Sequence, residues 1–164
     1  MAGTPTPALA ALAAAGVPHQ VVKFGHDPRR LSFGDRAVRA LTEACGVAPE
    51  QIYKTLVLAT PDGPAVAVLP ARARLSVKAA AAALGLSRAT MADRASAQRA
   101  TGYVIGAISP FGQRRPLPTV VDSDALAWGR VYCSAGRRGW DVAVAPQDLI
   151  RLTGAVTANI QQVS

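Results

Sequence analysis

The sequence predicts an α+β or mixed α/β domain, not a doubly wound parallel sheet. Helical segments and strand candidates are mixed along the chain, and two pairs of strand candidates are separated by tight turns that favour antiparallel pairing. The chain has 164 residues, of which half are hydrophobic and 17% are charged. This length and composition predict one domain, residues 1–164, with a hydrophobic core of its own.

Cap and turn residues define the elements of the first half of the chain. Thr6 is a suitable N-cap for a first helix, and Ser32 precedes a second helical pattern. Pro61, Asp62 and Gly63 form a strong turn signal between two apolar runs, which we interpret as the buried strands of a hairpin. The expected elements are a helix from Thr6 to Gly16, a strand at 19–24, a turn at 25–28, a helix at 33–45 followed by Gly46, and strands at Tyr53–Thr60 and 65–69.

The second half combines three capped helices, a segment rich in glycine and proline, and a second hairpin. Serine and aspartate are preferred N-caps, glycine ends helices, and proline suits the first helical turn. The expected elements are helices from Ser76 to Gly85 and from Asp93 to Gly102, an irregular segment at 102–118, a strand at Thr119–Asp122, strands at 130–134 and 140–145 joined by a glycine turn at 135–139, and a helix from Pro146 to Gly154.

Basic residues outnumber acidic residues by 18 to 10, which gives a formal net charge of +8. Only Lys23, Lys54 and Lys78 are lysines; the rest are arginines, whose planar guanidinium suits bidentate contacts with phosphate. The excess of arginine predicts a polyanionic partner such as nucleic acid, although a codon bias toward alanine and arginine is an alternative origin. The pairs Arg114–Arg115 and Arg137–Arg138 lie in expected loops, where they could bind a phosphate backbone or be merely solvated.

The composition argues against several classes of protein. Cys45 and Cys133 are too few for a disulfide framework, and no Cys/His cluster has zinc spacing, so we expect no metal and no cofactor. An enzyme with a Ser-His-Asp or Cys-His arrangement would have to use His19 or His26. No apolar run approaches the ~18 residues of a membrane span. The apolar segment 8–17 has no Lys or Arg before it, so we interpret it as a helix of a cytoplasmic protein, not a signal peptide.

Two features could carry chemistry. The segment 102–115 lacks the motifs of a phosphate loop, but its glycines would let a ligand approach, and backbone N–H groups could hold a carbonyl or ester oxygen. Lys54 begins an apolar strand, where its charge could face a phosphate or a developing oxyanion. The structural alternatives are a crossover with tight turns and a solvated lysine at a strand edge.

Other reactive side chains have structural interpretations as well. His26 and Asp27 could act in acid/base chemistry or form local hydrogen bonds in a turn. Cys133, in an expected strand, is typical of a small buried hydrophobe, and Ser109 and Ser134 have no obvious basic partner. The residues alone therefore predict a small basic domain with a glycine-lined pocket, and they do not name a reaction.

Several motifs resemble the YbaK/EbsC family of bacterial prolyl-tRNA editing domains, most closely the free-standing YbaK-type Cys-tRNA(Pro) deacylases. Lys-Thr-Leu at 54–56, GxxxP at 106–110 and Ser-x-Gly-x-Arg-Gly at 134–139 are specific in combination, and the resemblance covers nearly the whole chain in order. Further matching stretches are 6–8, 16–18, 26–27, 33–34, 91–93, 101–113, 117–118 and 148–149.

The resemblance implies a mixed, largely antiparallel, β-barrel-like sheet surrounded by helices. It also implies removal of a wrong amino acid from the 3′ end of tRNA(Pro). The family's essential lysine falls on Lys54. Position 24 is often tyrosine in the closest relatives, so Phe24 keeps the aromatic wall but lacks the hydroxyl. The implied pocket residues are Phe24, Phe33, Gly106, Ile108, Ser109, Pro110, Ser134 and Asp141, and the candidate tRNA contacts are Arg114, Arg115, Arg137 and Arg138.

The chemistry of the family needs no nucleophile from the protein. In its cysteine-clearing members the substrate thiol attacks its own ester carbonyl and leaves as a cyclic thiolactone, so that positioning and dipoles suffice. We therefore expect a Cys-tRNA(Pro) deacylase, with prolyl-tRNA synthetase as a further candidate partner. The alternatives are a water-dependent deacylase for Ala- or another small aminoacyl-tRNA, and a non-catalytic tRNA- or synthetase-binding module. Lys54 together with an intact GxxxP loop argues against the last.

Overall fold

A three-stranded antiparallel sheet pairs a strand near the N-terminus with a hairpin of the last third of the chain. The computed structural model describes residues 5–24, 39, 41–43 and 46–163. The sheet has the order β1 (Gln20–Lys23), β7 (Trp140–Val144), β6 (Val131–Arg137). The β6–β7 hairpin is the one predicted, but β6 continues to Arg137 through a register shift after Ser134. The predicted turn at 135–139 is therefore too long, because Gly136, at φ +91°, accommodates the irregularity within the strand.

A five-stranded mixed sheet forms the larger part of the protein. Its order is β4 (Thr90–Met91), β2 (Tyr53–Thr60), β3 (Gly63–Pro70), β5 (Thr119–Asp122) and β8 (Val156–Ala158). The pairs β2–β3 and β2–β4 are antiparallel, whereas β3–β5 and β5–β8 are parallel. The sequence predicts β2 and β5 with these bounds. It does not predict β4 and β8, which are only two and three residues long.

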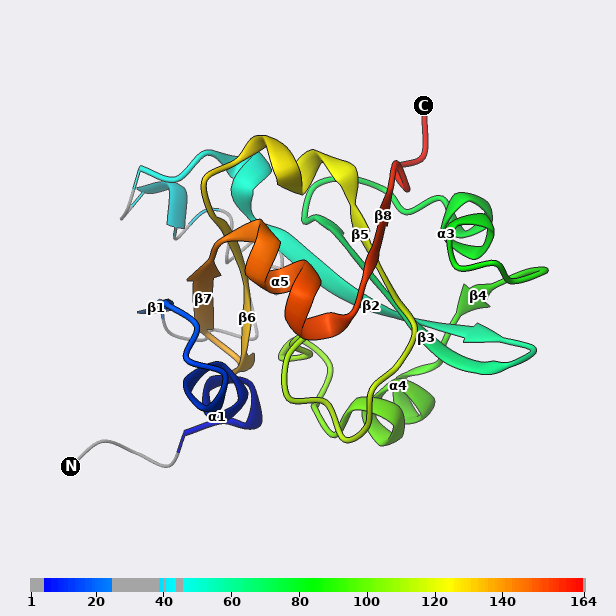
Figure 1. Ribbon diagram of the computed structural model, residues 1–164, viewed down its shortest axis with the longest axis horizontal. Helices are drawn as coiled ribbons and strands as arrows, with labels where there is room; N and C mark the ends of the chain where they lie inside the picture. Colours follow the sequence, from blue (N-terminus) through cyan, green and yellow to red (C-terminus); the bar gives the residue numbers. More distant parts are fainter. Residues whose placement is uncertain (1–4, 25–38, 40, 44–45, 164) are drawn as a thin grey trace.

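An isolated bridge links the two sheets, in which Ile52 pairs with Tyr132 in parallel. Figure 1 shows β1, β6 and β7 at one side of the molecule, with the β2–β3 hairpin extending to the other. The described strands thus confirm a mixed α+β fold with largely antiparallel pairing, in two linked open sheets and not a closed barrel.

Four α-helices whose bounds the structure describes pack on these sheets: α1 (Pro7–Ala14), α3 (Val77–Ala83), α4 (Arg94–Thr101) and α5 (Pro146–Thr153). Three predicted N-caps are confirmed, because the side chains of Thr6, Ser76 and Asp93 each accept a hydrogen bond from a backbone N–H three residues later. Ser32 lies outside the described residues. The 3₁₀ helices η1 (Pro49–Gln51) and η2 (Ser123–Ala127) were not predicted. Residues 41–43 are helical, as expected, and most of the second predicted helix lies outside the described residues.

Apolar side chains form one large cluster and two smaller ones. The large cluster draws residues from both sheets and from α1, α4 and α5; Tyr53, Val57 and Cys133 belong to it. A second cluster packs on the opposite face of the three-stranded sheet and contains Ile52 and Tyr132. A third covers the opposite face of the five-stranded sheet, beneath α3. Because side chains alternate along a strand, the residues next to Tyr53 and Cys133 face away from the large cluster.

Candidate functional site

Lys54 lies near the start of β2, close to the junction of the two sheets. Its neighbour Tyr53 packs into the large cluster, so alternation directs Lys54 to the opposite face. The side chain is partly buried, and its Nζ donates a hydrogen bond to the carbonyl oxygen of Ala73 at 2.7 Å. This ammonium is therefore held at a defined place instead of extending into solvent.

The bridge between the sheets brings Ser134 to the same face as Lys54. Ile52 and Tyr132 pair in parallel, and Lys54 and Ser134 each follow two residues later along their own strands. A spacing of two residues preserves the face. Ser134 Oγ accepts a hydrogen bond from the Gly136 amide at 3.1 Å, which leaves its hydroxyl proton to be donated to another group.

Asp141 completes this polar face from β7. It lies opposite Ser134 in the register and is only 6% exposed. Desolvation by burial raises the pKa of its carboxyl to about 7. We call Lys54, Ser134 and Asp141 the polar face. Three residues predicted from separate motifs thus share one face of the linked sheets.

Cys133 points to the other side. It is fully buried in the large cluster, and burial, with a contribution from the Asp141 charge, raises the pKa of its thiol well above the usual value. A buried neutral thiol is a poor nucleophile, so the interpretation of Cys133 as a small hydrophobe is favoured.

The aromatic wall is described only in part. Phe24 is half-buried and packs against the cluster around Tyr132, and its backbone N–H donates to the Gly139 carbonyl at 2.8 Å. It therefore lies beside the β6–β7 hairpin that carries Ser134 and Asp141. Phe33, the His26–Asp27 turn and Cys45 lie outside the described residues.

The GxxxP loop, residues 106–110, begins at Gly106 in the left-handed region, at φ +88°. Ile108, Ser109 and Pro110 are buried. Ser109 is fully buried, and its Oγ accepts from the Phe111 amide at 3.2 Å. The Ser109 side chain therefore stabilises the loop from within. Backbone groups near Gly106 are the part of this loop that a ligand could contact.

Arg138 ties this loop to the β6–β7 hairpin. Its Nε and Nη2 donate to the carbonyl oxygen of Ile105 at 3.1 and 2.9 Å. The residue before Gly106 is thus held against the turn that separates Ser134 from Asp141. Arg138 was predicted as a tRNA contact, and the structure gives it a structural contact as well.

The two predicted arginine pairs lie in different surroundings. The guanidinium of Arg137 is 4.8 Å from the Trp140 ring centroid, and Lys23 Nζ is 4.1 Å from the same centroid. Arg114 and Arg115 instead line a separate cleft beside α4 and the far end of the β2–β3 hairpin. The sequence gives no reason to distinguish the two arginine pairs, whereas the structure places them in different parts of the molecule.

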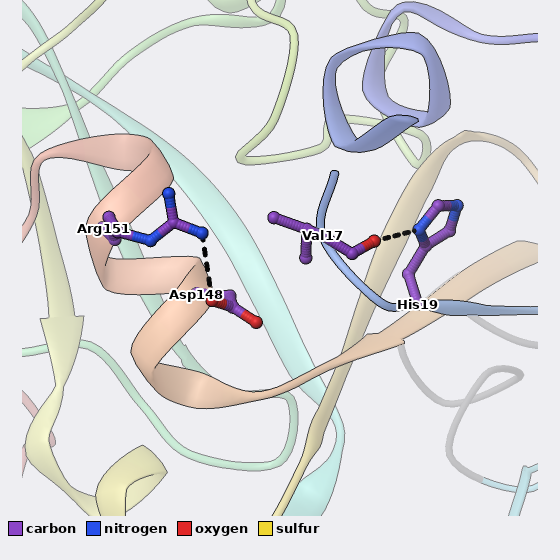
Figure 2. A network of polar contacts seen from close by, with 4 residues as sticks. All are labelled: Val17, His19, Asp148 and Arg151. Atoms are coloured by element: carbon purple, nitrogen blue, oxygen red, sulfur yellow. Dashed lines mark hydrogen bonds and ion pairs between the residues drawn. The ribbon is translucent and has the colours of Figure 1, made fainter. Parts of the chain in front are cut away.

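His19 is not part of the polar face. Its Nδ1 lies 2.7 Å from the Val17 carbonyl oxygen (Figure 2). A carbonyl only accepts, so Nδ1 carries the proton in this contact.

Figure 2 also shows Arg151 paired with Asp148 on α5; the two side chains are 3.1 Å apart. Among the described residues, no group of three His, Cys, Asp or Glu side chains is arranged to hold a metal ion, and no helix has the length and apolarity to cross a membrane.

Two further features near Lys54 are not apparent from the sequence. Tyr53 Oη and Thr55 Oγ1, on either side of Lys54, are buried without a hydrogen-bond partner among the described residues. Burial also raises the pKa of the Tyr53 hydroxyl. Tyrosine and threonine are common in apolar strands, so no sequence pattern indicates that these two hydroxyl groups are buried without a hydrogen-bond partner.

Ala73, the acceptor of the Lys54 hydrogen bond, lines a cleft of about 540 Å³ that is also lined by Arg72, Asp124 and Trp128.

The linked sheets thus carry a lysine, a serine and an aspartate on one polar face. Residues 35–152 match the aminoacyl-tRNA editing domain family. The chain belongs to this family.

Similar proteins cover nearly the same length. "Putative Cys-tRNA(Pro)/Cys-tRNA(Cys) deacylase EbsC" of Enterococcus faecalis is 31% identical over 145 residues, 88% of this chain and 85% of that protein. The crystal structure of "a putative trans-editing enzyme for prolyl tRNA synthetase" is 26% identical, with a TM-score of 0.82 over 96% of each chain. The structure of hypothetical protein APE2540 has a TM-score of 0.80 at 24% identity, over 95% of this chain and 99% of its own; this likeness concerns the fold alone.

Proposed function

We propose that this protein clears Cys-tRNA(Pro) by letting the substrate thiol attack its own ester. The cysteine thiolate adds to the ester carbonyl carbon, and the carbon–oxygen bond to the terminal ribose breaks. The ribose oxygen takes up the proton that the thiol released, and cysteine leaves as a cyclic thiolactone. The family assignment supports aminoacyl-tRNA editing, and the name of the Enterococcus relative supports cysteine as the amino acid.

The observation that carries the proposal is the position of Lys54. Its ammonium is fixed by the Ala73 carbonyl and shares a face with Ser134 and Asp141. In the proposal, Lys54 contacts the terminal adenosine phosphate or ribose and holds the ester toward the Gly106 backbone. A charge held in place before the reaction stabilises developing negative charge without reorganisation.

The surroundings of the described nucleophiles also favour the substrate thiol. Cys133 is buried away from the polar face, and His19 is bound to a backbone carbonyl. In the proposal, the protein contributes by bending the aminoacyl group and aligning its thiol with the carbonyl, which is catalysis by proximity. The proposal treats residues 1–164 as one editing domain that acts in the cytoplasm, with prolyl-tRNA synthetase as a candidate partner.

Deacylation of three substrates tests the proposal. Cys-tRNA(Pro), Ala-tRNA(Pro) and Ser-tRNA(Pro) are compared under single-turnover conditions, with products separated by mass spectrometry. We expect rapid release of cysteine thiolactone and near loss of turnover with serine, because a hydroxyl is a much weaker nucleophile than a thiolate. Faster release of free alanine would identify a water-dependent deacylase instead. No turnover of any of the three would contradict a catalytic role in tRNA(Pro) editing.

Cys133→Ala separates the substrate thiol from the protein thiol. The variant should deacylate Cys-tRNA(Pro) like the unmodified protein and lose about 1–2 kcal/mol of stability, since a small buried side chain is truncated. Lost turnover with an intact circular dichroism spectrum would make Cys133 the nucleophile and refute the mechanism.

A further inference from the structure

A cleft of about 520 Å³ lies beside α4 and the far end of the β2–β3 hairpin. Its apolar lining comes from Val57, Leu58 and Pro64 of the hairpin and from Ala92 and Ala100. Figure 1 shows α4 below this end of the hairpin, away from β6 and β7. The cleft is therefore separate from the polar face.

Three arginines line this cleft: Arg99 of α4, and Arg114 and Arg115 of the segment that leads to β5. All three are exposed, and within the described part of the chain none of them forms an ion pair. Among the described residues that line the cleft there is no aspartate or glutamate. Asp93, whose carboxyl pKa is lowered by hydrogen bonds from Ser96 and in smaller part by the Arg99 charge, already accepts hydrogen bonds from Ser96. The cleft thus has three positive charges and no acidic residue in its lining.

The backbone holds these arginines in place. The Arg114 amide donates to the Thr101 carbonyl at 3.0 Å, so the segment is attached to the last turn of α4. Gly102 caps that helix at φ +84°, and a Cβ built there would lie 3.7 Å from Arg114 Nε. The Arg114 side chain therefore passes directly over the helix end. Arg99 lies in the same last turn.

We propose that this cleft, lined by Arg99, Arg114 and Arg115, binds the phosphate backbone of an RNA stem. Guanidinium groups suit phosphate oxygens, and phosphate contacts hold a nucleic acid in register without reading its sequence. The proposal rests on the proposed function only in choosing tRNA as the RNA. Arg137 and Arg138 are less suited to this role, because one stacks on Trp140 and the other is bound to the Ile105 carbonyl.

The separation of the two sites favours a polymeric ligand. The part of β2 that lines the cleft begins at Val57, three positions after Lys54, and ends at Thr60, six positions after it. At about 3.3 Å per residue these distances are roughly 10 and 20 Å. A stacked nucleic-acid strand rises about 3.4 Å per nucleotide, so about three to six nucleotides would span them. An RNA whose 3′ end lies at Lys54 could therefore place its stem on the arginines.

Binding of uncharged tRNA, measured against salt concentration, tests this inference independently of deacylation. The double variant Arg114→Gln/Arg115→Gln should reduce the slope of log affinity against log salt by about 2, that is by about 1 for each lost phosphate contact. Arg99→Gln should reduce it by about 1. The matched control, Arg74→Gln/Arg88→Gln, removes two exposed arginines outside the cleft and should leave the slope within about 0.5 of the parent value.

Three results would overturn the inference. The first is a cleft variant with the slope of the control. The second is inorganic phosphate that competes with tRNA at equal concentration, which would indicate a small-anion site. The third is poly-glutamate that competes as well as RNA, which would indicate an acidic protein partner. Circular dichroism checks folding, and Arg115→Gln alone replaces the double variant if the latter is unfolded. Absence of deacylation by the parent protein would refute the proposed function and leave this test intact.

Discussion

At the scale of single residues, Lys54 carries the most weight in the proposed chemistry. Lys54→Ala should lower kcat/KM about 10–150-fold, because a charge-assisted hydrogen bond contributes roughly 1.5–3 kcal/mol. Lys54→Arg should restore only part of the activity, since a planar guanidinium does not replace a compact ammonium. Lys78→Ala, an exposed lysine of α3, is the control. Single-turnover rates near those of the parent for Lys54→Ala would identify Lys54 as a structural lysine.

Asp141 should make stability depend on pH. Its carboxyl has a pKa near 3.8 when unfolded and about 7 when buried. Between these values the folded protein keeps a proton that the unfolded chain has lost, so stability is highest below about pH 4 and falls as pH rises through 7. The full difference corresponds to roughly 4 kcal/mol at most. Urea unfolding from pH 4 to 8 measures it.

The control for this prediction is Asp141→Asn, which cannot titrate. Its stability curve should be flatter than that of the parent, and its advantage should be largest at pH 8. Parallel curves for the two proteins would show that Asp141 does not keep the proton.

At the scale of elements, Gly112 marks a contact between the segment after GxxxP and α1. It has φ +63°, and a Cβ built there would lie 2.3 Å from the Pro7 carbonyl oxygen. Gly112→Ala should therefore cost about 2–5 kcal/mol, from left-handed strain together with backbone overlap. Gly154→Ala has nearly the same φ, +62°, with nothing within 4 Å, so its cost should be limited to about 1–2 kcal/mol. Thermal unfolding compares them, and equal losses would exclude a close approach to α1.

The sequence predicts elements well where local chemistry decides them. Thr6, Ser76 and Asp93 act as N-caps, because a side-chain oxygen satisfies a backbone N–H three residues away. β8 is not predictable in this way. Its three residues are exposed or half-buried, and they form a strand because β5 supplies the partners. Within β6, Gly136 lies so close to Thr6 and Tyr103 that an added Cβ would overlap the Tyr103 ring at 2.8 Å, a contact that no local pattern reveals.

The candidate site was predictable only as a set of separate motifs. The family resemblance selects Lys54, Ser134 and Asp141, but no local pattern places them on one face. That placement depends on the parallel bridge between Ile52 and Tyr132. The sequence does not indicate Arg99 as a phosphate contact, because an arginine in an amphipathic helix is usually a solvated residue. The structure places it in the same cleft as Arg114, which is held over the end of the same helix.

At the scale of the whole molecule, the net charge of +8 is distributed among distinct environments. Arg151 is paired with Asp148, Arg137 stacks on Trp140, and Arg138 holds the GxxxP loop. The composition alone predicts a basic protein with a polyanionic partner. Only the tertiary arrangement distinguishes arginines that support the fold from those that line a cleft.

The bridge between Ile52 and Tyr132 also bears on how the protein acquires activity as it folds. Its two residues are 80 positions apart in the chain (132 − 52), whereas β2–β3 and β6–β7 are hairpins of near neighbours. Local pairings close quickly and distant ones slowly, because loop-closure entropy grows with sequence separation. Both hairpins can therefore be native before the bridge forms. Lys54 and Ser134 then come together in a nonlocal step that follows the hairpins, so that deacylation would report tertiary assembly more faithfully than secondary-structure content does.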